Sequence, residues 1–159
     1  MRADEDSVTA DALSPDFDRF YREHRGRLER LGHVLTGSRT VGEELAQEAL
    51  LATSVAWDDL DEPRAFARRV LVNKAASFTR HQVVTRRYLS ARRGPTDQPA
   101  LDYLWDVIVK LRPEPRIAVV LRFYEDLSID EIAQITDVPP GTVKSRLHRA
   151  MSKMRRELR

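Results

Sequence analysis

The chain has 159 residues, a net charge of +2, no cysteine, and no apolar run near the roughly 20 residues that span a bilayer. Disulfide bonds, cysteine-based zinc sites and a membrane span are therefore excluded, and the acidic N-terminus lacks the apolar stretch of a secretory signal. Without a signal or a span, we expect a cytoplasmic protein. Scarce glycine and weak strand-like alternation favour an all-α fold, and the length suits one ordinary domain or two small helical ones.

The chain opens with an acidic segment and then a first helical block. Residues 1–15 are polar and without periodicity, and we expect a disordered tail. Apolar side chains then recur at helical spacing up to Leu35, which predicts a helix that begins near Pro15. Gly37 is a natural residue to end it.

Two further helices are predicted in this block. Residues 40–57 have a narrow face of small and apolar side chains that would permit close helix packing. Pro63 suits the first turn of a third helix, over residues 63–80, because the missing N–H is not needed there. The small-residue face comprises Val41, Leu45, Ala49, Ala52 and Ala56, and the apolar side of the third helix comprises Phe66, Val70, Leu71 and Phe78.

A segment rich in glycine, proline and polar residues follows at residues 91–100, and its composition is typical of a linker. We expect the blocks on either side to move relative to each other in the free protein, since few apolar residues are left to join them. The second block begins with a helix that stops before Pro113, and another helix is predicted at about residues 117–124.

Residues 127–147 have the pattern of a helix-turn-helix. Ser128 and Glu131 have the S-x-x-E spacing of a capping box, which starts a short helix. Asp137 lies at the turn and tolerates a left-handed backbone better than most residues, and Pro140 can open the next helix.

The second helix of this motif separates into an apolar face and a basic face. Val143, Leu147, Ala150 and Met154 recur on one side, and hydroxyl, Lys and Arg side chains lie on the other. A basic outer face after a tight turn is typical of a helix that enters the DNA major groove. The alternative is an amphipathic surface helix of an ordinary bundle.

The charges cluster despite the small net charge. Residues 64–93 hold nine Lys and Arg and no acid, and residues 138–159 hold seven against one glutamate. Two separated basic segments suggest two contacts with a polyanion, although most charge runs are solvated helix faces.

The helix-turn-helix resembles a known family. Residues 127–133 followed by residues 141–150 closely resemble the promoter −35 binding region of extracytoplasmic-function sigma factors, in particular the actinobacterial sigma-E-like group. Asp137 departs from the glycine usual at the turn of that family.

The first block resembles the family's other domain. Residues 35–37 with residues 43–50 look like its polymerase-binding segment, and Trp57 with residues 69–80 looks like its −10 segment. Both parts occur in the family's order over about residues 16–158, which is more specific than either motif alone.

The resemblance implies two small helical domains, region 2 at residues 16–90 and region 4 at residues 101–159, joined by the linker. It implies a sigma factor that binds core RNA polymerase and directs promoter-specific initiation by recognising −10 and −35 elements and assisting promoter melting. No catalysis, cofactor or membrane insertion is expected of this subunit, and an anti-sigma protein as a partner stays open.

The resemblance also assigns residues to three contacts. A mixed stripe of carboxylates and apolar side chains on the second helix suits docking on the clamp helices of the polymerase largest subunit. On the third helix, guanidinium groups can hold phosphates and an amide can read a base edge, and the loop before it would hold an unstacked base. The alternatives without a function are that the stripe is an ordinary solvated helix face and that Trp57 is a core residue. The candidates are Glu44, Gln47, Glu48 and Leu51 for polymerase; Trp57, Arg64, Arg69, Asn73 and Arg80 for −10 DNA; and Thr142, Lys144, Ser145, Arg146, Arg149 and Lys153 for −35 DNA.

Three other functions compete with this interpretation. A plain DNA-binding regulator would need a receiver or ligand domain, which the first block does not resemble. An enzyme would need a catalytic motif, yet the four histidines are scattered and no Gly-rich phosphate loop, HExxH or GxSxG is present. A helical adaptor would not need two basic segments. Initiation by core polymerase at a defined start site, supported by the purified protein, distinguishes all four.

Overall fold

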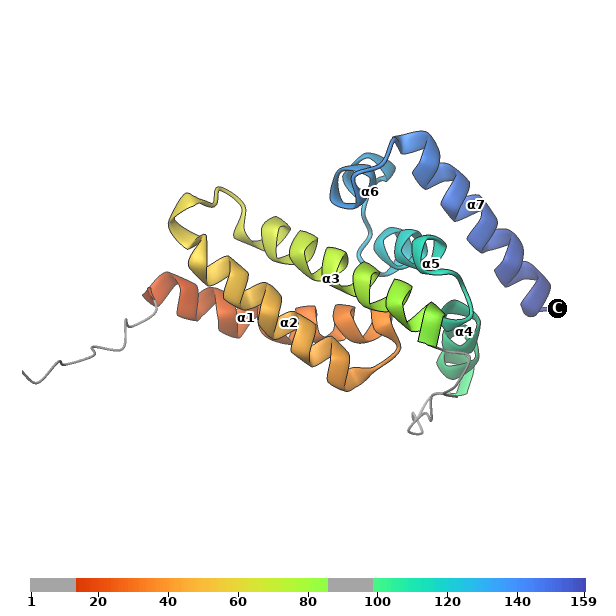
Figure 1. Ribbon diagram of the computed structural model, residues 1–159, viewed down its shortest axis with the longest axis horizontal. Helices are drawn as coiled ribbons and strands as arrows, with labels where there is room; N and C mark the ends of the chain where they lie inside the picture. Colours follow the sequence, from red (N-terminus) through yellow and green to blue (C-terminus); the bar gives the residue numbers. More distant parts are fainter. Residues whose placement is uncertain (1–13, 86–98) are drawn as a thin grey trace, which may run out of the picture.

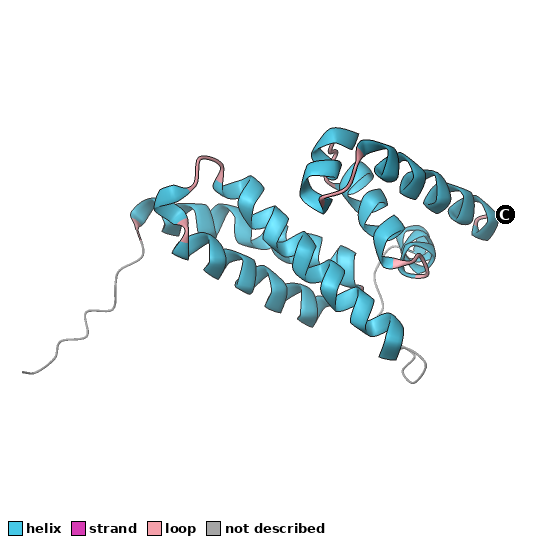
Figure 2. Ribbon diagram, turned by 45° about the horizontal axis from the view of Figure 1, so that its top comes forward, coloured by secondary structure: helices cyan, strands magenta, loops and turns pink. Residues whose placement is uncertain are grey.

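The computed structural model describes residues 14–85 and 99–159, and within these ranges the chain is built of helices without a strand (Figures 1 and 2). The all-α prediction is confirmed. The acidic tail and most of the predicted linker lie outside the described residues, although Pro99 and Ala100 already belong to a helix. The helices are α1 (Pro15–Thr36), α2 (Arg39–Val55), η1 (Trp57–Asp59), α3 (Pro63–Thr85), α4 (Pro99–Val109), α5 (Pro113–Val119), η2 (Val120–Tyr124), α6 (Ile129–Thr136) and α7 (Pro140–Glu157).

We call α1–α3 the N-terminal block and α4–α7 the C-terminal block. Within the described ranges, no helix is both long and apolar enough to cross a membrane. The predicted helix at about residues 117–124 begins earlier, at Pro113, and its last part is the π-helical turn η2.

Helices α1 and α2 form an antiparallel pair with a short connection. Gly37 adopts φ 78°, and its N–H donates to the carbonyl oxygen of His33 at 2.8 Å, which ends α1 as predicted. Ser38 then caps α2, because its Oγ accepts a hydrogen bond from the N–H of Val41 at 3.3 Å.

The two helices approach most closely where glycine faces glycine. A Cβ on Gly32 would lie 2.7 Å from the carbonyl oxygen of Gly42, so only two glycines permit this contact. The buried face of α2 is therefore rotated around the helix from the predicted small-residue face, and that prediction is wrong. The buried face is centred nearer Gly42, and a glycine has no side chain that could reveal it in the apolar pattern. The buried residues of α2 are Gly42, Ala46, Ala49, Leu50 and Thr53.

Helix α3 completes the N-terminal block and runs to Thr85, further than predicted. Leu71 is fully buried as expected, whereas Phe66, Val70 and Phe78 are only half-buried. The residues that α3 buries in the core are Ala67, Leu71, Val72 and Ala75.

The two blocks pack against each other through α3, which lies beside α5 and α6 (Figure 1). One continuous apolar cluster joins Leu71 and Val72 of α3 to Leu121 of η2 and Ile132 of α6. The expectation that few apolar residues join the blocks is therefore wrong. Helical periodicity predicts that these side chains point inward, but it does not show that some of them pack against the other block.

A buried arginine connects the ends of several helices at this junction. The side chain of Arg116 donates through Nη1 to the carbonyl oxygen of Leu35 at 3.4 Å, and through Nη2 to those of Val109 and Leu111 at 2.5 and 3.0 Å. The last carbonyls of a helix lack intrahelical partners and carry partial negative charge. Arg116 therefore satisfies carbonyls at the C-terminal ends of both α1 and α4.

Candidate functional site

The helix-turn-helix has the local geometry that its sequence predicts. Ser128 Oγ accepts from the N–H of Glu131 at 3.1 Å, and Glu131 Oε2 accepts from the N–H of Ser128 at 2.8 Å, which is a complete capping box. The hydrogen bonds from Ser128 lower the pKa of the Glu131 carboxyl. Asp137 adopts φ 53°, in the left-handed region, and Pro140 occupies the first turn of α7.

Helix α7 packs by its apolar side and leaves its basic side outward. Val143, Ala150 and Met154 are buried, as predicted. Two of the six candidates for −35 DNA have hydrogen bonds within the chain. Lys153 Nζ donates to the carbonyl oxygen of Lys110 at 2.8 Å, and Ser145 Oγ donates to that of Gly141 at 3.0 Å. The exposed candidates are Lys144, Ser145 and Arg149, and the half-buried ones are Thr142, Arg146 and Lys153.

The stripe proposed for polymerase lies on the open side of α2. Leu51 and Val55 are 66% and 82% exposed, which is unusual for large aliphatic side chains placed side by side on one helix. Gln47 exchanges hydrogen bonds with the hydroxyl of Tyr21 on α1, and Glu48 pairs with Lys74 of α3 at 2.6 Å. The exposed candidates of this stripe are Glu44, Gln47, Glu48 and Leu51.

Of the candidates for −10 DNA on α3, Arg69, Asn73 and Arg80 share an outward face, whereas Arg64 lies at the start of the helix on the side of Arg68. Arg64, Asn73 and Arg80 are exposed, and Arg69 is exposed as well but donates through Nη2 to the carbonyl oxygen of Gln134 in α6, at 3.3 Å. The C-terminal block therefore contacts one residue of this face.

Trp57 packs on aromatic side chains of α1. Its ring lies 5.2 Å, centroid to centroid, from both Phe17 and Phe20 of α1, in an edge contact with Phe17 and a tilted one with Phe20. Such geometry is typical of aromatic clusters in a core. The half-buried Trp57 thus packs the start of α1 against the loop before α3.

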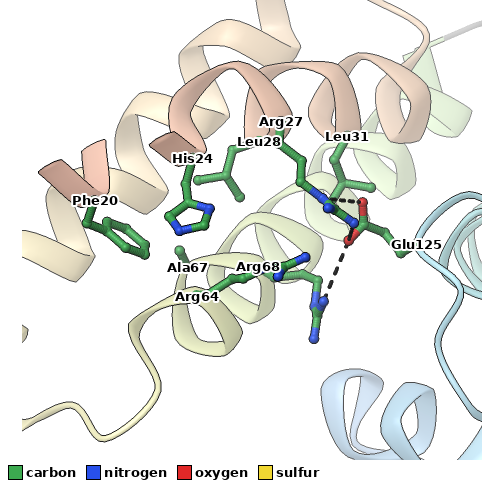
Figure 3. A pocket seen from close by; sticks show the side chains of 9 residues that line it. All are labelled: Phe20, His24, Arg27, Leu28, Leu31, Arg64, Ala67, Arg68 and Glu125. Atoms are coloured by element: carbon green, nitrogen blue, oxygen red, sulfur yellow. Dashed lines mark hydrogen bonds and ion pairs between the residues drawn. The ribbon is translucent and has the colours of Figure 1, made fainter. Parts of the chain in front are cut away.

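Sequence reasoning missed a charged cluster between the two blocks (Figure 3). The side chain of Glu125 is only 3% exposed and forms ion pairs with Arg27 of α1 and Arg68 of α3, at 3.4 and 3.6 Å. One signal was present, because Arg68 lies in register with the apolar Leu71 and Ala75, where a basic side chain is unexpected.

Glu125 is the one carboxylate among the side chains that line the cavity in this cluster, and its charged neighbours there are arginines. Arg64 and His24 also line the small cavity beside it. Burial lowers the pKa of the His24 imidazole, and the charges of Arg64 and Arg27 lower it further, outweighing the opposite effect of Glu23. In the described part of the chain, no group of three or more His, Asp or Glu side chains could hold a metal ion.

A helix-turn-helix with a basic outer helix, beside a second helical block, defines a class of DNA-binding proteins. The family model described as Sigma-70, region 4 matches residues 101–154. Among curated proteins, the RNA polymerase sigma-E factor of Streptomyces avermitilis is 32% identical over 152 residues, which cover 90% of this chain and 85% of that protein. The ECF RNA polymerase sigma factor SigW of Bacillus subtilis is 26% identical over an aligned region that covers 86% of this chain and 85% of that protein.

Solved structures share the fold. The sigma factor RpoE of Bartonella quintana, determined in complex with the anti-sigma factor NepR, superposes with a TM-score of 0.76 at 20% identity, over 91% of this chain and 98% of that one. CnrH, determined in complex with the cytosolic domain of CnrY, gives a TM-score of 0.66 at 22% identity, over 89% of this chain and 86% of that one. The chain belongs to the RNA polymerase sigma factors of the extracytoplasmic-function type.

Proposed function

We propose that this sigma factor directs core RNA polymerase to promoters through three separate surfaces, on α2, α3 and α7. The observation that carries the proposal is the combination of an exposed apolar and acidic stripe on α2 with two exposed basic helix faces on α3 and α7. A regulator that only binds DNA would need the basic faces but not the stripe.

The surface on α2 binds the polymerase. Leu51 and Val55 offer apolar area, and the neighbouring carboxylates of Glu44 and Glu48 offer charge complementarity to a basic helical partner. This arrangement fits the clamp helices of the largest subunit, which the family resemblance names as the partner. Desolvating the two exposed aliphatic side chains would favour association.

The surface on α7 binds the −35 element. The capping box and the turn at Asp137 orient α7. Its first two turns carry the exposed Lys144 and Ser145 and the half-buried Thr142 and Arg146. Hydroxyl and basic groups near the N-terminus of a recognition helix reach phosphates and base edges. Lys153 contributes only if its bond to Lys110 exchanges for a phosphate.

The surface on α3 binds the −10 element and assists its melting. Arg69 and Arg80 can hold phosphates, and the amide of Asn73 can read a base edge on the same face. Arg64 can hold a phosphate at the start of the helix, beside the loop. Trp57 supports the loop before α3 by packing on Phe17 and Phe20. That loop would hold a base pulled from the duplex.

This subunit contributes binding energy and no catalysis, since polymerase carries out the chemistry, and the factor works in the cytoplasm with that enzyme. We further propose that an anti-sigma protein regulates it. This proposal is supported by the structure of RpoE from Bartonella quintana, which was determined in complex with the anti-sigma factor NepR.

The test is run-off transcription with core polymerase and genomic promoter fragments. We expect transcripts with a defined start site only when the protein is added. Transcription that is equally specific without the protein would overturn the proposed function.

A further inference from the structure

Glu125 is a buried carboxylate that belongs to one block and is bound by the other. It follows η2 in the C-terminal block, and both of its ion-pair partners come from the N-terminal block (Figure 3). Arg27 donates through Nε to Oε1 and through Nη2 to Oε2, each at 3.4 Å. Arg68 Nη1 lies 3.6 Å from Oε2. One carboxylate therefore serves two guanidinium groups.

The two arginines are incompletely satisfied by this carboxylate. Charge-assisted hydrogen bonds between a guanidinium and a carboxylate are usually about 2.7–2.9 Å long, shorter than the distances found here. Arg68 Nε is buried and has no hydrogen-bond partner among the described residues. The ion pairs found for Arg27 and Arg68 within the described ranges both end on Glu125. A larger anion with more acceptor oxygens would suit the pair better than a carboxylate.

The position of the pair indicates which anion this is. Arg68 directly precedes Arg69, a residue of the α3 face to which we assign −10 DNA, and Arg64 lies one turn before Arg68 on the same side of the helix. Arg64 lines the same cavity as the pair and is itself exposed, so it extends the basic site to the surface at the start of α3. The side chain of Arg27 is 45% exposed, which leaves the site reachable from solvent at the block junction.

We propose that Arg27 and Arg68 form a site for a DNA backbone phosphate, and that Glu125 occupies this site while the two blocks are packed together. The proposal rests on the proposed function in one respect, namely that the phosphate belongs to promoter DNA. Because both anions need the same guanidinium groups, DNA binding at this site and the closed packing of the blocks exclude each other. Removing Glu125 from the site therefore strengthens DNA binding.

The experiment measures binding of the full chain to a fluorescein-labelled single-stranded DNA oligonucleotide, by anisotropy at several salt concentrations. The variants are Glu125→Gln, which removes the charge, and Glu125→Asp, which keeps the charge but withdraws it by one methylene group. The matched control is Asp126→Asn, because Asp126 is exposed, has the same charge, and its φ of 54° suits asparagine. Circular dichroism melts verify that each variant is folded.

We expect both Glu125 variants to bind the oligonucleotide at least about 3-fold tighter than Asp126→Asn does, with a salt slope steeper by about 0.7 for each phosphate gained. Adding Arg27→Gln or Arg68→Gln to Glu125→Gln abolishes this gain. If Glu125→Gln does not fold, Glu125→Asp carries the test. Binding equal to that of the control, or a gain that survives both arginine replacements, would overturn the proposal.

The run-off assay separates this proposal from the proposed function. Wild-type protein that supports transcription, combined with Glu125 variants that bind DNA like the control, overturns the phosphate site alone. Wild-type protein that fails in transcription, combined with the expected gains in oligonucleotide binding, overturns the proposed function and leaves the phosphate site standing.

Discussion

The guanidinium group of Arg69 donates a hydrogen bond to the carbonyl oxygen of Gln134, at 3.3 Å. Arg69 belongs to the α3 face that we assign to −10 DNA, and Gln134 belongs to the first helix of the helix-turn-helix. A polymerase-bound factor must place these two surfaces on promoter elements more than one helical turn of DNA apart. Under these assignments, we expect the contact between them to break when the protein acts.

This leads to a prediction about the closed packing. The chain has no cysteine, so the double variant Arg69→Cys/Gln134→Cys can be joined by a short bis-maleimide crosslinker without other thiols reacting. We expect the crosslinked protein to give at least about 10-fold less run-off transcript than the same variant left uncrosslinked, because the two DNA-binding surfaces cannot separate. Equal transcript from both forms would show that separation is not needed.

Polymerase binding should depend on the stripe of α2. We expect Gln47→Lys/Glu48→Lys to weaken the pull-down of core polymerase while leaving the fold intact, since both side chains are exposed and the change reverses the charge offered to a basic partner. Lys74→Ala is the matched control, because it removes the ion pair with Glu48 and leaves the stripe unchanged. A double variant that retains core as well as wild type does would contradict the assignment.

The −35 contact should be sensitive to salt and centred on α7. Replacing the exposed Arg149 with alanine should cost about 1–3 kcal/mol of DNA affinity if it reads a base, or reduce the salt slope by about one if it holds a phosphate. Titration of promoter DNA at several salt concentrations distinguishes the two. Arg159→Ala, beyond the end of α7, is the control. Unchanged affinity and slope would mean that the outer face is wrongly assigned.

The closest approach of α1 and α2 should be intolerant of side chains. A Cβ on Gly42 would lie 2.3 Å from the backbone nitrogen of His33, so Gly42→Ala must force the two helices apart. We expect it to lower the free energy of unfolding by about 1–3 kcal/mol, as overpacking does elsewhere. Gly141→Ala should not destabilise, because a Cβ there meets nothing within 4 Å. Urea denaturation measures both, and similar midpoints would contradict the close approach.

The sequence by itself determined the features that depend on neighbours along the chain. The end of α1 at Gly37, the capping box of Ser128 and Glu131, and the left-handed Asp137 all involve residues within one helical turn of each other. Helical periodicity likewise predicted that Leu51 points outward on α2 and that Val143 points inward on α7. Short-range hydrogen bonds and helix geometry suffice for these results.

Only the tertiary structure decided which inward-facing residues meet. The approach of Gly32 and Gly42 left no sign in the apolar pattern, because glycine has no side chain to count. Glu125 and Arg27 are 98 residues apart, and no local rule connects a carboxylate with a guanidinium group at that separation. Long-range pairs of this kind form only when whole helices pack, because burying a charge is costly unless an opposite charge lies opposite it.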